Sequence, residues 1–438
     1  MISGVISESG GSFGFTKMGN NANQVLILSG TNTYTGPTTV SIGTLTIGGA
    51  GELGSGNYSA PITNYAIFNY ASSAAQTLAG AIAGASTNLL VQSGPGPLTL
   101  SGTNILTGGL VISNGATLII AAPGCLGVTP SGTNYAGAFA NNGTFIYNSS
   151  AAQTLSGAIS GAGALVQSGA GTLTLTAGNN YTGSTVITNG ATLVLGSGGS
   201  VNTTPAITIG AGATLDVSAY TSYSMLSGIT LNASGTGATP GSTAATIKGS
   251  ASGGATVTVA GPMVLTFKPQ TLTGDTTHPA LFISQISSGQ LVVSSASLTV
   301  NNAGGSPLAA GTYSLIQVVA GGTISLGSPT VTVTGSGMAA GATASLSVSG
   351  TSVNLVVTGG VSTPPVINSL VISGGNLIFS GTNGAHGGTY YVLSSSNVAL
   401  PLSQWSSIAT DTFSGTGTFS VTNPVGTDPS RFFIIKSP

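Results

Sequence analysis

Leu28-Ser-Gly-Thr-Asn-Thr-Tyr-Thr-Gly36 is the stretch that decides the fold, because the chain repeats it twice. The other copies are Leu100-Ser-Gly-Thr-Asn-Ile-Leu-Thr-Gly108 and Leu175-Thr-Ala-Gly-Asn-Asn-Tyr-Thr-Gly183, and the starts lie 72 and 75 residues apart. Each copy is followed by a short apolar strand and a Gly-(Ala)-Thr-Leu step that begins at Gly43, Gly115 or Gly190. Self-similarity at a fixed period is the signature of stacked structural units. The sequence therefore predicts a solenoid.

A second repeat gives the size of the unit. Phe68-Asn-Tyr-Ala-Ser-Ser-Ala-Ala-Gln-Thr-Leu78 returns, shifted by 77 residues, as Phe145-Ile-Tyr-Asn-Ser-Ser-Ala-Ala-Gln-Thr-Leu155. With rungs of about 20 to 25 residues, each unit holds about three rungs. Stacked rungs place like residues over like, so Leu, Ile and Val fill an inner column and the matched aromatic residues lie inside or along the coil.

The local signals are those of an all-β chain. Glycine accounts for 70 of the 438 residues, and β-branched residues dominate the apolar positions. Both features disfavour helices, and alternation such as Thr172-Leu-Thr-Leu-Thr176 indicates strands. Asn-Gly steps at Asn114, Asn142 and Asn189 leave a hairpin open at those places, although the long self-similarity favours a coil.

The repeat fades after residue 226, and four segments are expected. Residues 1–226 hold the repeats, and residues 227–360 stay rich in strands with longer loops, as an irregular continuation or cap. Residues 361–366 (Val-Ser-Thr-Pro-Pro-Val) form a proline-stiffened linker. Residues 367–438 predict a small Ig-like antiparallel β-sandwich. Its strands are expected at 369–373, 376–380, 389–394, 417–421 and 431–435, with Trp405 as its core anchor.

Charge is nearly absent. The chain has five Lys and Arg and six Asp and Glu, and residues 53–215 contain no Asp, Glu, Lys, Arg or His. Nucleic-acid binding needs clustered basic residues, which this chain lacks. No apolar run approaches the roughly 20 residues of a membrane-spanning helix. The N-terminal segment lacks the features of a signal peptide and resembles the interior of a repeat, so we expect the chain to begin partway through a longer protein.

The sequence offers few candidates for chemistry. The acids are Glu8, Glu52, Asp216, Asp275, Asp411 and Asp428, and only the last two lie within twenty residues of each other. Asp216 is expected to face solvent at a rung edge. Asp275 and His278 are the nearest approach to an acid–imidazole pair, for which a polar loop is favoured over a site. His386 has no partner at metal-ligand spacing. Cys125 is expected to be a buried structural thiol. The prediction is therefore a chain without catalytic, cofactor-binding or metal-binding residues.

The three Asn-x-(Tyr/Leu)-Thr-Gly copies, with their Gly-(Ala)-Thr-Leu steps, closely resemble the autotransporter-associated β-strand repeat, also called the passenger-associated transport repeat. The resemblance covers about residues 1–225 and implies a right-handed parallel β-helix in a large bacterial surface or secreted protein. Ala309-Ala-Gly-Thr-Tyr-Ser-Leu-Ile316 also resembles the end of such passengers. The 73 residues after Pro365 are too few for the membrane translocator such proteins carry, so the export route stays open and the tail is expected to anchor or sort the chain.

These expectations combine into one function and one alternative. The chain is expected to be a non-catalytic, structural or adhesive stalk, extracellular or on the outer cell surface, with surface glycans as candidate partners and without nucleic acid, membrane span or cofactor. The alternative is a carbohydrate-binding or polysaccharide-degrading β-helix. A groove lined with aromatic residues would favour the alternative.

Overall fold

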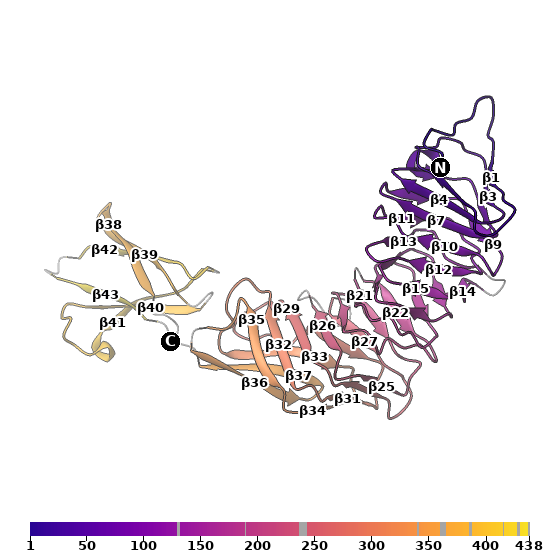
Figure 1. Ribbon diagram of the computed structural model, residues 1–438. Helices are drawn as coiled ribbons and strands as arrows, with labels where there is room; N and C mark the ends of the chain where they lie inside the picture. The colour runs from indigo at the N-terminus through magenta and orange to yellow at the C-terminus, as the bar shows by residue number, and fades with distance from the viewer. Residues whose placement is uncertain are drawn as a thin grey trace.

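The computed structural model describes residues 1–128, 132–188, 190–235, 243–339, 341–359, 365–384, 388–414, 416–426 and 430–436. Within these ranges the chain is built from strands, with two short 3₁₀ turns, η1 (Gly54–Gly56) and η2 (Leu402–Gln404). The strands stack into an elongated solenoid, and a separate module follows it at the C-terminal end (Figure 1). The all-β prediction is confirmed.

Two long sheets run along the solenoid. In spatial order, the longer sheet contains β5 (Asn57–Tyr58), β8 (Gln76–Leu78), β11 (Leu98–Leu100), β13 (Thr117–Ala121), β16 (Thr144–Asn148), β19 (Ala164–Gln167), β21 (Thr185–Ile187), β23 (Ala206–Ile209), β26 (Thr230–Ser234), β29 (Met263–Phe267), β32 (Ser297–Asn302) and β35 (Thr330–Gly335). The second contains β14 (Asn134–Tyr135), β17 (Gln153–Leu155), β20 (Leu173–Leu175), β22 (Thr192–Leu195), β24 (Thr214–Asp216), β27 (Ala245–Lys248), β30 (Leu281–Ser284), β33 (Gly311–Val318), β37 (Ser352–Gly359) and β36 (Ala342–Ser349).

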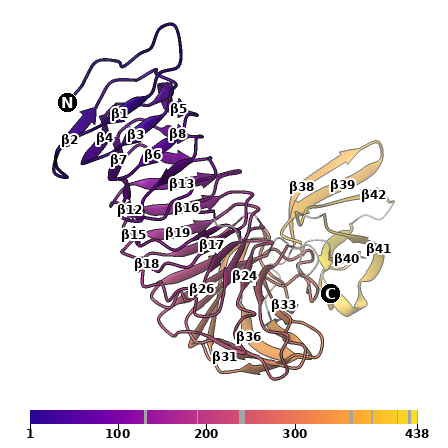
Figure 2. The same ribbon diagram turned by 90° about the vertical axis from the view of Figure 1, so that its right-hand side faces the viewer.

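Three shorter sheets complete the walls of the solenoid (Figure 2). The first contains β2 (Val25–Leu28), β4 (Thr44–Gly49), β7 (Ile67–Ser72), β10 (Leu89–Gln92), β12 (Gly109–Ile112), β15 (Phe139–Asn141) and β18 (Ile159–Ser160). The second contains β1 (Phe15–Lys17), β3 (Thr38–Val40), β6 (Ile62–Asn64) and β9 (Ile82–Gly84). The third contains β25 (Ser222–Met225), β28 (Thr256–Val259), β31 (Gln290–Val293) and β34 (Thr323–Leu326).

Apart from the pairings of β37 with β33 and β36, neighbouring strands of these sheets are parallel. On β11, Leu98 pairs with Leu118 of the next rung. Leu118 pairs in turn with Phe145, and Phe145 pairs with Leu165. All four side chains are buried. Burial of such a side chain contributes about 1.5–3 kcal/mol, so a continuous inner column holds the rungs together. The predicted parallel β-helix is confirmed.

The rungs lengthen along the solenoid. Leu90 pairs with Leu110, twenty residues later, whereas Leu265 pairs with Val300, thirty-five residues later. The longer sheet crosses residue 226 without a break, because β23 pairs directly with β26. The far end is antiparallel, since β37 pairs with β33 and β36 pairs with β37. Residues 227–359 therefore contain both wider rungs and an antiparallel end.

The asparagine of the repeat joins three successive rungs. Asn104 is fully buried, and its Oδ1 accepts a hydrogen bond from Ile82 N at 2.9 Å. Its Nδ2 donates to Gly102 O at 2.9 Å and to Cys125 O at 2.7 Å. The other copies make the same three bonds: Asn32 with Ile6 N, Gly30 O and Glu52 O, and Asn179 with Ile159 N, Ala177 O and Ser200 O. A short amide side chain is required because it both accepts and donates.

The repeat glycines have two separate roles. Gly43, Gly115 and Gly190 have φ values of 77°, 75° and 72°, a left-handed conformation that other residues adopt only with strain. The glycine that ends the Asn-x-Tyr-Thr-Gly motif instead lies against the preceding rung: a Cβ on Gly183 would overlap the Gly163 carbonyl and come within 2.7 Å of Ala164 N. The motif thus encodes rung corners and close stacking.

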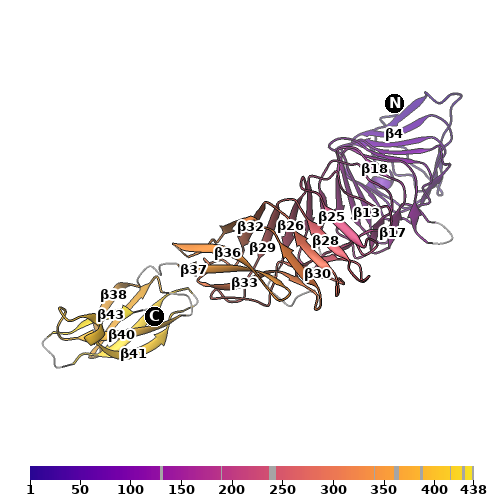
Figure 3. The same ribbon diagram turned by 90° about the horizontal axis from the view of Figure 1, so that it is seen from below.

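The C-terminal module consists of two three-stranded antiparallel sheets (Figure 3). One contains β38 (Val366–Ser373), β39 (Asn376–Thr382) and β42 (Phe419–Pro424), and the other contains β41 (Ser406–Thr412), β40 (Thr389–Ser395) and β43 (Phe432–Lys436). They share a buried core that is separate from the core of the solenoid. Strand β41 was not expected from the sequence. Of the predicted linker, residues 361–364 lie outside the described residues, and Val366 begins β38.

Candidate functional site

Trp405 does not anchor the core of the C-terminal module, so this prediction is wrong. It follows the turn η2, is only half-buried, and its Nε1 donates to Leu400 O at 3.0 Å. The core is formed instead by side chains from the strands and from the segment after β41: Phe379, Tyr390, Val392, Phe413, Phe419, Val421 and Ile435. A single tryptophan is therefore satisfied locally while the smaller rings pack between the sheets.

The prediction that Asp216 faces solvent is also wrong. Asp216 pairs in register with Lys248 of the next rung, whose Nζ lies 2.8 Å from Asp216 Oδ2. The Asp216 side chain is 9% exposed, against 35% for the lysine side chain. Burial alone would raise the pKa of Asp216, but hydrogen bonds from Lys248 and Ser218 outweigh it and lower the pKa below the usual value. The ion pair links two neighbouring rungs, and the Asp216 carboxylate is occupied by Lys248.

We expect Asp216→Asn to lower the free energy of unfolding by about 1 kcal/mol at pH 7, an amount reduced by solvent screening of the half-exposed lysine. Because the folded pKa is lowered, this stabilisation is present above the unfolded pKa of about 3.9 and is lost as the pH falls through the folded pKa. Urea unfolding at several pH values measures the difference. A difference that stays constant from pH 7 to pH 2 would contradict the ion-pair explanation.

Asp275 and His278 lie together but serve their own loop. His278 Nδ1 is 2.8 Å from Asp275 Oδ1, and the carboxylate also accepts bonds from Gln270 N at 2.7 Å and Thr277 N at 3.1 Å. Asp275 itself is buried. Burial would raise its pKa, yet these bonds together lower it. The geometry is that of a carboxylate that closes a loop, with its oxygens already occupied.

The remaining candidates do not converge. Among the described residues, no group of three or more His, Cys, Asp or Glu side chains is placed to hold a metal ion. Glu8 accepts hydrogen bonds from Phe13 N and from Thr35, which lower its pKa. Cys125 is buried as expected, and burial raises the pKa of its thiol. His386 and Asp428 lie outside the described residues.

The repeat aromatics lie inside the coil. The matched residues Tyr34, Tyr181, Phe68, Phe145, Tyr70 and Tyr147 are all buried. Tyr34 and Tyr181 each bond the threonine four residues later, at 2.8 Å to Thr38 and 2.6 Å to Thr185, and burial raises both phenol pKa values. The second copy has Leu106 and Leu110 instead, so both partners change together and no hydroxyl is left unpaired. These rings are core residues and do not line a groove.

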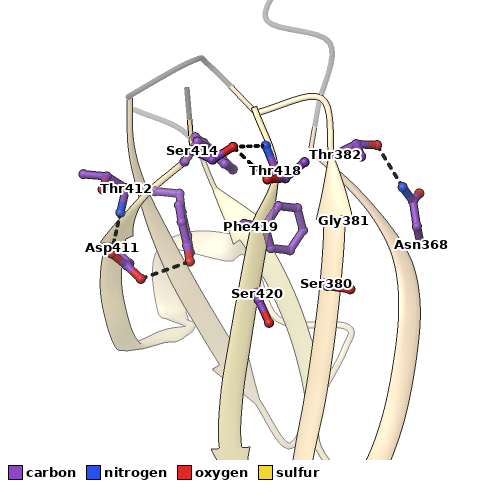
Figure 4. Close-up of a pocket in the computed structure, with 12 residues that line it drawn as sticks. Asn368, Ser380, Gly381, Thr382, Asp411, Thr412, Ser414, Thr418, Phe419 and Ser420 are labelled. Carbon is purple, nitrogen blue, oxygen red and sulfur yellow. Dashed lines mark hydrogen bonds between the residues drawn. The ribbon is translucent and has the colours of Figure 1, made fainter. Parts of the chain in front are cut away.

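One polar pocket lies at an end of the C-terminal module (Figure 4). It has a volume of about 640 Å³, and its walls come from β38, β39, β40, β41 and β42 and from the segment between β41 and β42. Its lining residues are Asn368, Ser380, Gly381, Thr382, Tyr390, Asp411, Thr412, Phe413, Ser414, Thr418, Phe419 and Ser420. No sequence pattern pointed to it, because its polar and aromatic residues are spread over about fifty positions of the sequence. It is the candidate binding site.

The few basic residues predict a simple proteolysis pattern. Lys17 is buried and bonds two backbone carbonyls, Lys248 is paired with Asp216, and the Lys268–Pro269 bond is a poor trypsin substrate. Arg431 and Lys436 are exposed at the ends of β43. Trypsin should therefore trim the native chain only after Arg431 and Lys436 and leave residues 1–431 intact. Mass spectrometry of a time course tests this, and early cleavage after Lys17 would contradict the burial of that side chain.

The described residues include no helix with the length and apolar character needed to cross a membrane.

Comparison with known proteins places the repeats in a family. The family model described as the passenger-associated-transport-repeat matches residues 24–47, 90–120 and 165–195. These segments contain the three rung-joining asparagines, Asn32, Asn104 and Asn179. Searches of curated proteins and of solved structures gave no match. The chain therefore carries three segments that match the passenger-associated-transport-repeat, and these repeats form rungs in the first half of its β-helix.

Proposed function

We propose that this chain is a non-catalytic, passenger-like scaffold: a β-helical rod that stands outside the bacterial cell and carries the C-terminal module. The observation that carries the proposal is that the distinctive residues of the repeat serve the packing of the rungs. Asn104 joins rungs, Tyr181 bonds within the core, and Gly183 permits close stacking. These residues serve the stacking of the rungs, so they build a rod and present no reactive group. The family match supports a passenger-like protein.

The scarcity of charge supports a life outside the cell. The rod exposes few bonds that trypsin-like proteases cleave, and its longest charge-free stretch, residues 53–215, lies within the repeats. Solvent-facing strand positions carry Thr, Asn and Ser, as at Thr99 and Asn69. Such a surface is polar without being charged. It suits a stalk that must resist degradation and avoid nonspecific electrostatic binding.

Antibody labelling of the bacterium that encodes the chain tests the location. Antibodies against the full chain should label intact cells or recover the chain from the medium. Labelling that requires permeabilised cells would contradict the proposal. Deletion of residues 366–438 tests the proposed anchoring or sorting role of the module. The truncated rod should no longer be found at the location that the full chain occupies. Unchanged location after the deletion would exclude that role.

The enzymatic alternative has its own test. Glycoside hydrolysis requires two carboxyl groups about 5–9.5 Å apart, and the described carboxylates of Asp216 and Asp275 are occupied by their own partners. The full chain incubated with a panel of neutral and acidic polysaccharides should release no new reducing ends. Release above a heat-treated control would contradict the non-catalytic assignment.

A further inference from the structure

The pocket of the C-terminal module has a size that suits a small ligand. Its volume of about 640 Å³ falls within the roughly 300–1,000 Å³ of typical small-molecule sites. Figure 4 shows Asp411 and Thr412 on one side, Asn368 and Thr382 on the other, and Phe419 between them. Strands from both sheets thus contribute, and the pocket depends on the folded module.

The lining selects the chemistry of the ligand. It includes seven residues with hydroxyl groups, together with the Asn368 amide and the Asp411 carboxylate. The seven are Ser380, Thr382, Tyr390, Thr412, Ser414, Thr418 and Ser420. None of the described lining residues is Lys, Arg or His. Among these residues, anions such as phosphates or uronic acids would meet a carboxylate without a cation to offset it. Hydroxyls, an amide and a single carboxylate instead match a ligand that presents many neutral hydroxyl groups.

The floor and the walls are held in place before any ligand arrives. Tyr390, Phe413 and Phe419 are buried, with ring centroids 4.6 Å apart for Tyr390–Phe413 and 5.9 Å apart for Phe413–Phe419. Ser414 Oγ lies 2.7 Å from Thr418 Oγ1, and Asn368 Nδ2 donates to Thr382 Oγ1 at 2.9 Å (Figure 4). A preorganised site loses less entropy on binding.

Asp411 provides the strongest acceptor. Its Oδ1 accepts a bond from Thr412 N at 2.8 Å, whereas among the described residues its Oδ2 has the Tyr390 hydroxyl, 3.5 Å away, as its partner. The side chain is on the exposed rim. Burial, with the nearby carboxylate, raises the pKa of Tyr390, which therefore stays a hydroxyl donor. A carboxylate oxygen with spare capacity favours hydroxyl donors, because charge-assisted hydrogen bonds are the stronger kind.

We infer that this pocket binds one or two residues of an uncharged saccharide, with Asp411 and the hydroxyl rim as its hydrogen-bonding groups. The inference gives the proposed anchoring module a ligand class and rests on that proposed function for its biological role. The binding itself is independent of it. A module that holds a neutral glycan would attach the rod to a surface without using charge.

Isothermal titration calorimetry of the full chain tests the inference with cellobiose, maltose and mannobiose as neutral probes, and with glucose 6-phosphate and glucuronic acid as anionic probes. At least one neutral disaccharide should bind saturably at a ratio of one. Asp411→Asn and Thr418→Val should each weaken that binding at least tenfold. Thr410→Val, an exposed change on the same strand outside the lining, should not. Equal melting temperatures identify variants that remain folded.

Three results would overturn the inference. These are the absence of saturable binding to all three neutral disaccharides, anionic probes that bind as tightly as neutral ones, and neutral binding that Asp411→Asn and Thr418→Val leave unchanged. None of them bears on antibody labelling of intact cells, so failure here and failure of the proposed scaffold function are distinguishable.

Discussion

Gly183→Ala should destabilise the β-helix by about 3 kcal/mol, the upper end of the usual cost of overpacking. The new Cβ would overlap the carbonyl of Gly163 on the preceding rung and come within 2.7 Å of Ala164 N. These atoms are backbone, so no side-chain rotation relieves the overlap and the rungs must separate locally. The same stacking recurs in the other copies, where a Cβ on Gly36 or Gly108 would overlap the backbone of the preceding rung. Urea unfolding followed by circular dichroism measures the change.

Gly228→Ala is the matched control. A Cβ at this position meets no atom within 4 Å, and its φ is not in the left-handed region. This substitution should leave stability unchanged or raise it slightly, because alanine reduces the entropy of the unfolded chain. Equal effects of the two substitutions would contradict the close-stacking role of Gly183.

Asn104→Leu should cost about 3 kcal/mol. Ile82 N would lose its acceptor inside the protein, and an orphaned buried donor costs about 1–3 kcal/mol. Gly102 O and Cys125 O would each lose one hydrogen bond but keep a backbone donor, so each adds a smaller cost of roughly 0.5–1.5 kcal/mol. Leucine is similar in size, so the loss is mainly of hydrogen bonding. The same unfolding measurement applies.

Asn114→Leu is the control for that substitution. Asn114 is exposed in a turn of the same repeat, and its side chain makes no hydrogen bond within the part of the chain that the structure describes. Its replacement should change stability by less than about 0.5 kcal/mol. A loss at Asn114 as large as that at Asn104 would mean that leucine at any loop position is harmful, and the rung-joining role of Asn104 would then be unsupported.

The sequence predicts the β-helix because repetition at a fixed period indicates stacked units. The matched residues Phe68 and Phe145 are both buried, but they lie in different sheets, on β7 and β16, so the copies of the long repeat do not stack directly over one another. The buried Cys125 also follows from its apolar neighbours. The general character of the C-terminal module follows from its change in composition. Strand β41 was missed because Ser406-Ser-Ile-Ala-Thr-Asp-Thr412 lacks the alternation of apolar and polar residues on which strand prediction depends.

Two of the misses, Asp216 and the pocket, come from contact between residues far apart in sequence, whereas Trp405 is satisfied locally. Asp216 alternates like a solvent-facing residue, yet it pairs with Lys248, thirty-two residues later. Trp405 is the largest side chain of its module, but its indole is satisfied by Leu400 O, and Phe413 and Phe419 pack the core instead. The pocket could not be predicted from the sequence, because Asn368 and Asp411 belong to different sheets and line one pocket only when the two sheets pack together.

Hydrogen exchange of the wild-type chain and Asn104→Leu tests the central claim, that the repeat asparagine is an architectural link between three rungs. Exchange should accelerate together around residues 80–84, 102–106 and 125–127, because Ile82, Gly102 and Cys125 all lose a bond to one side chain. The C-terminal module, with its separate core, should exchange as in the wild type. Acceleration confined to the segment around residue 104, or no change in any of the three segments, would contradict this role of the asparagine.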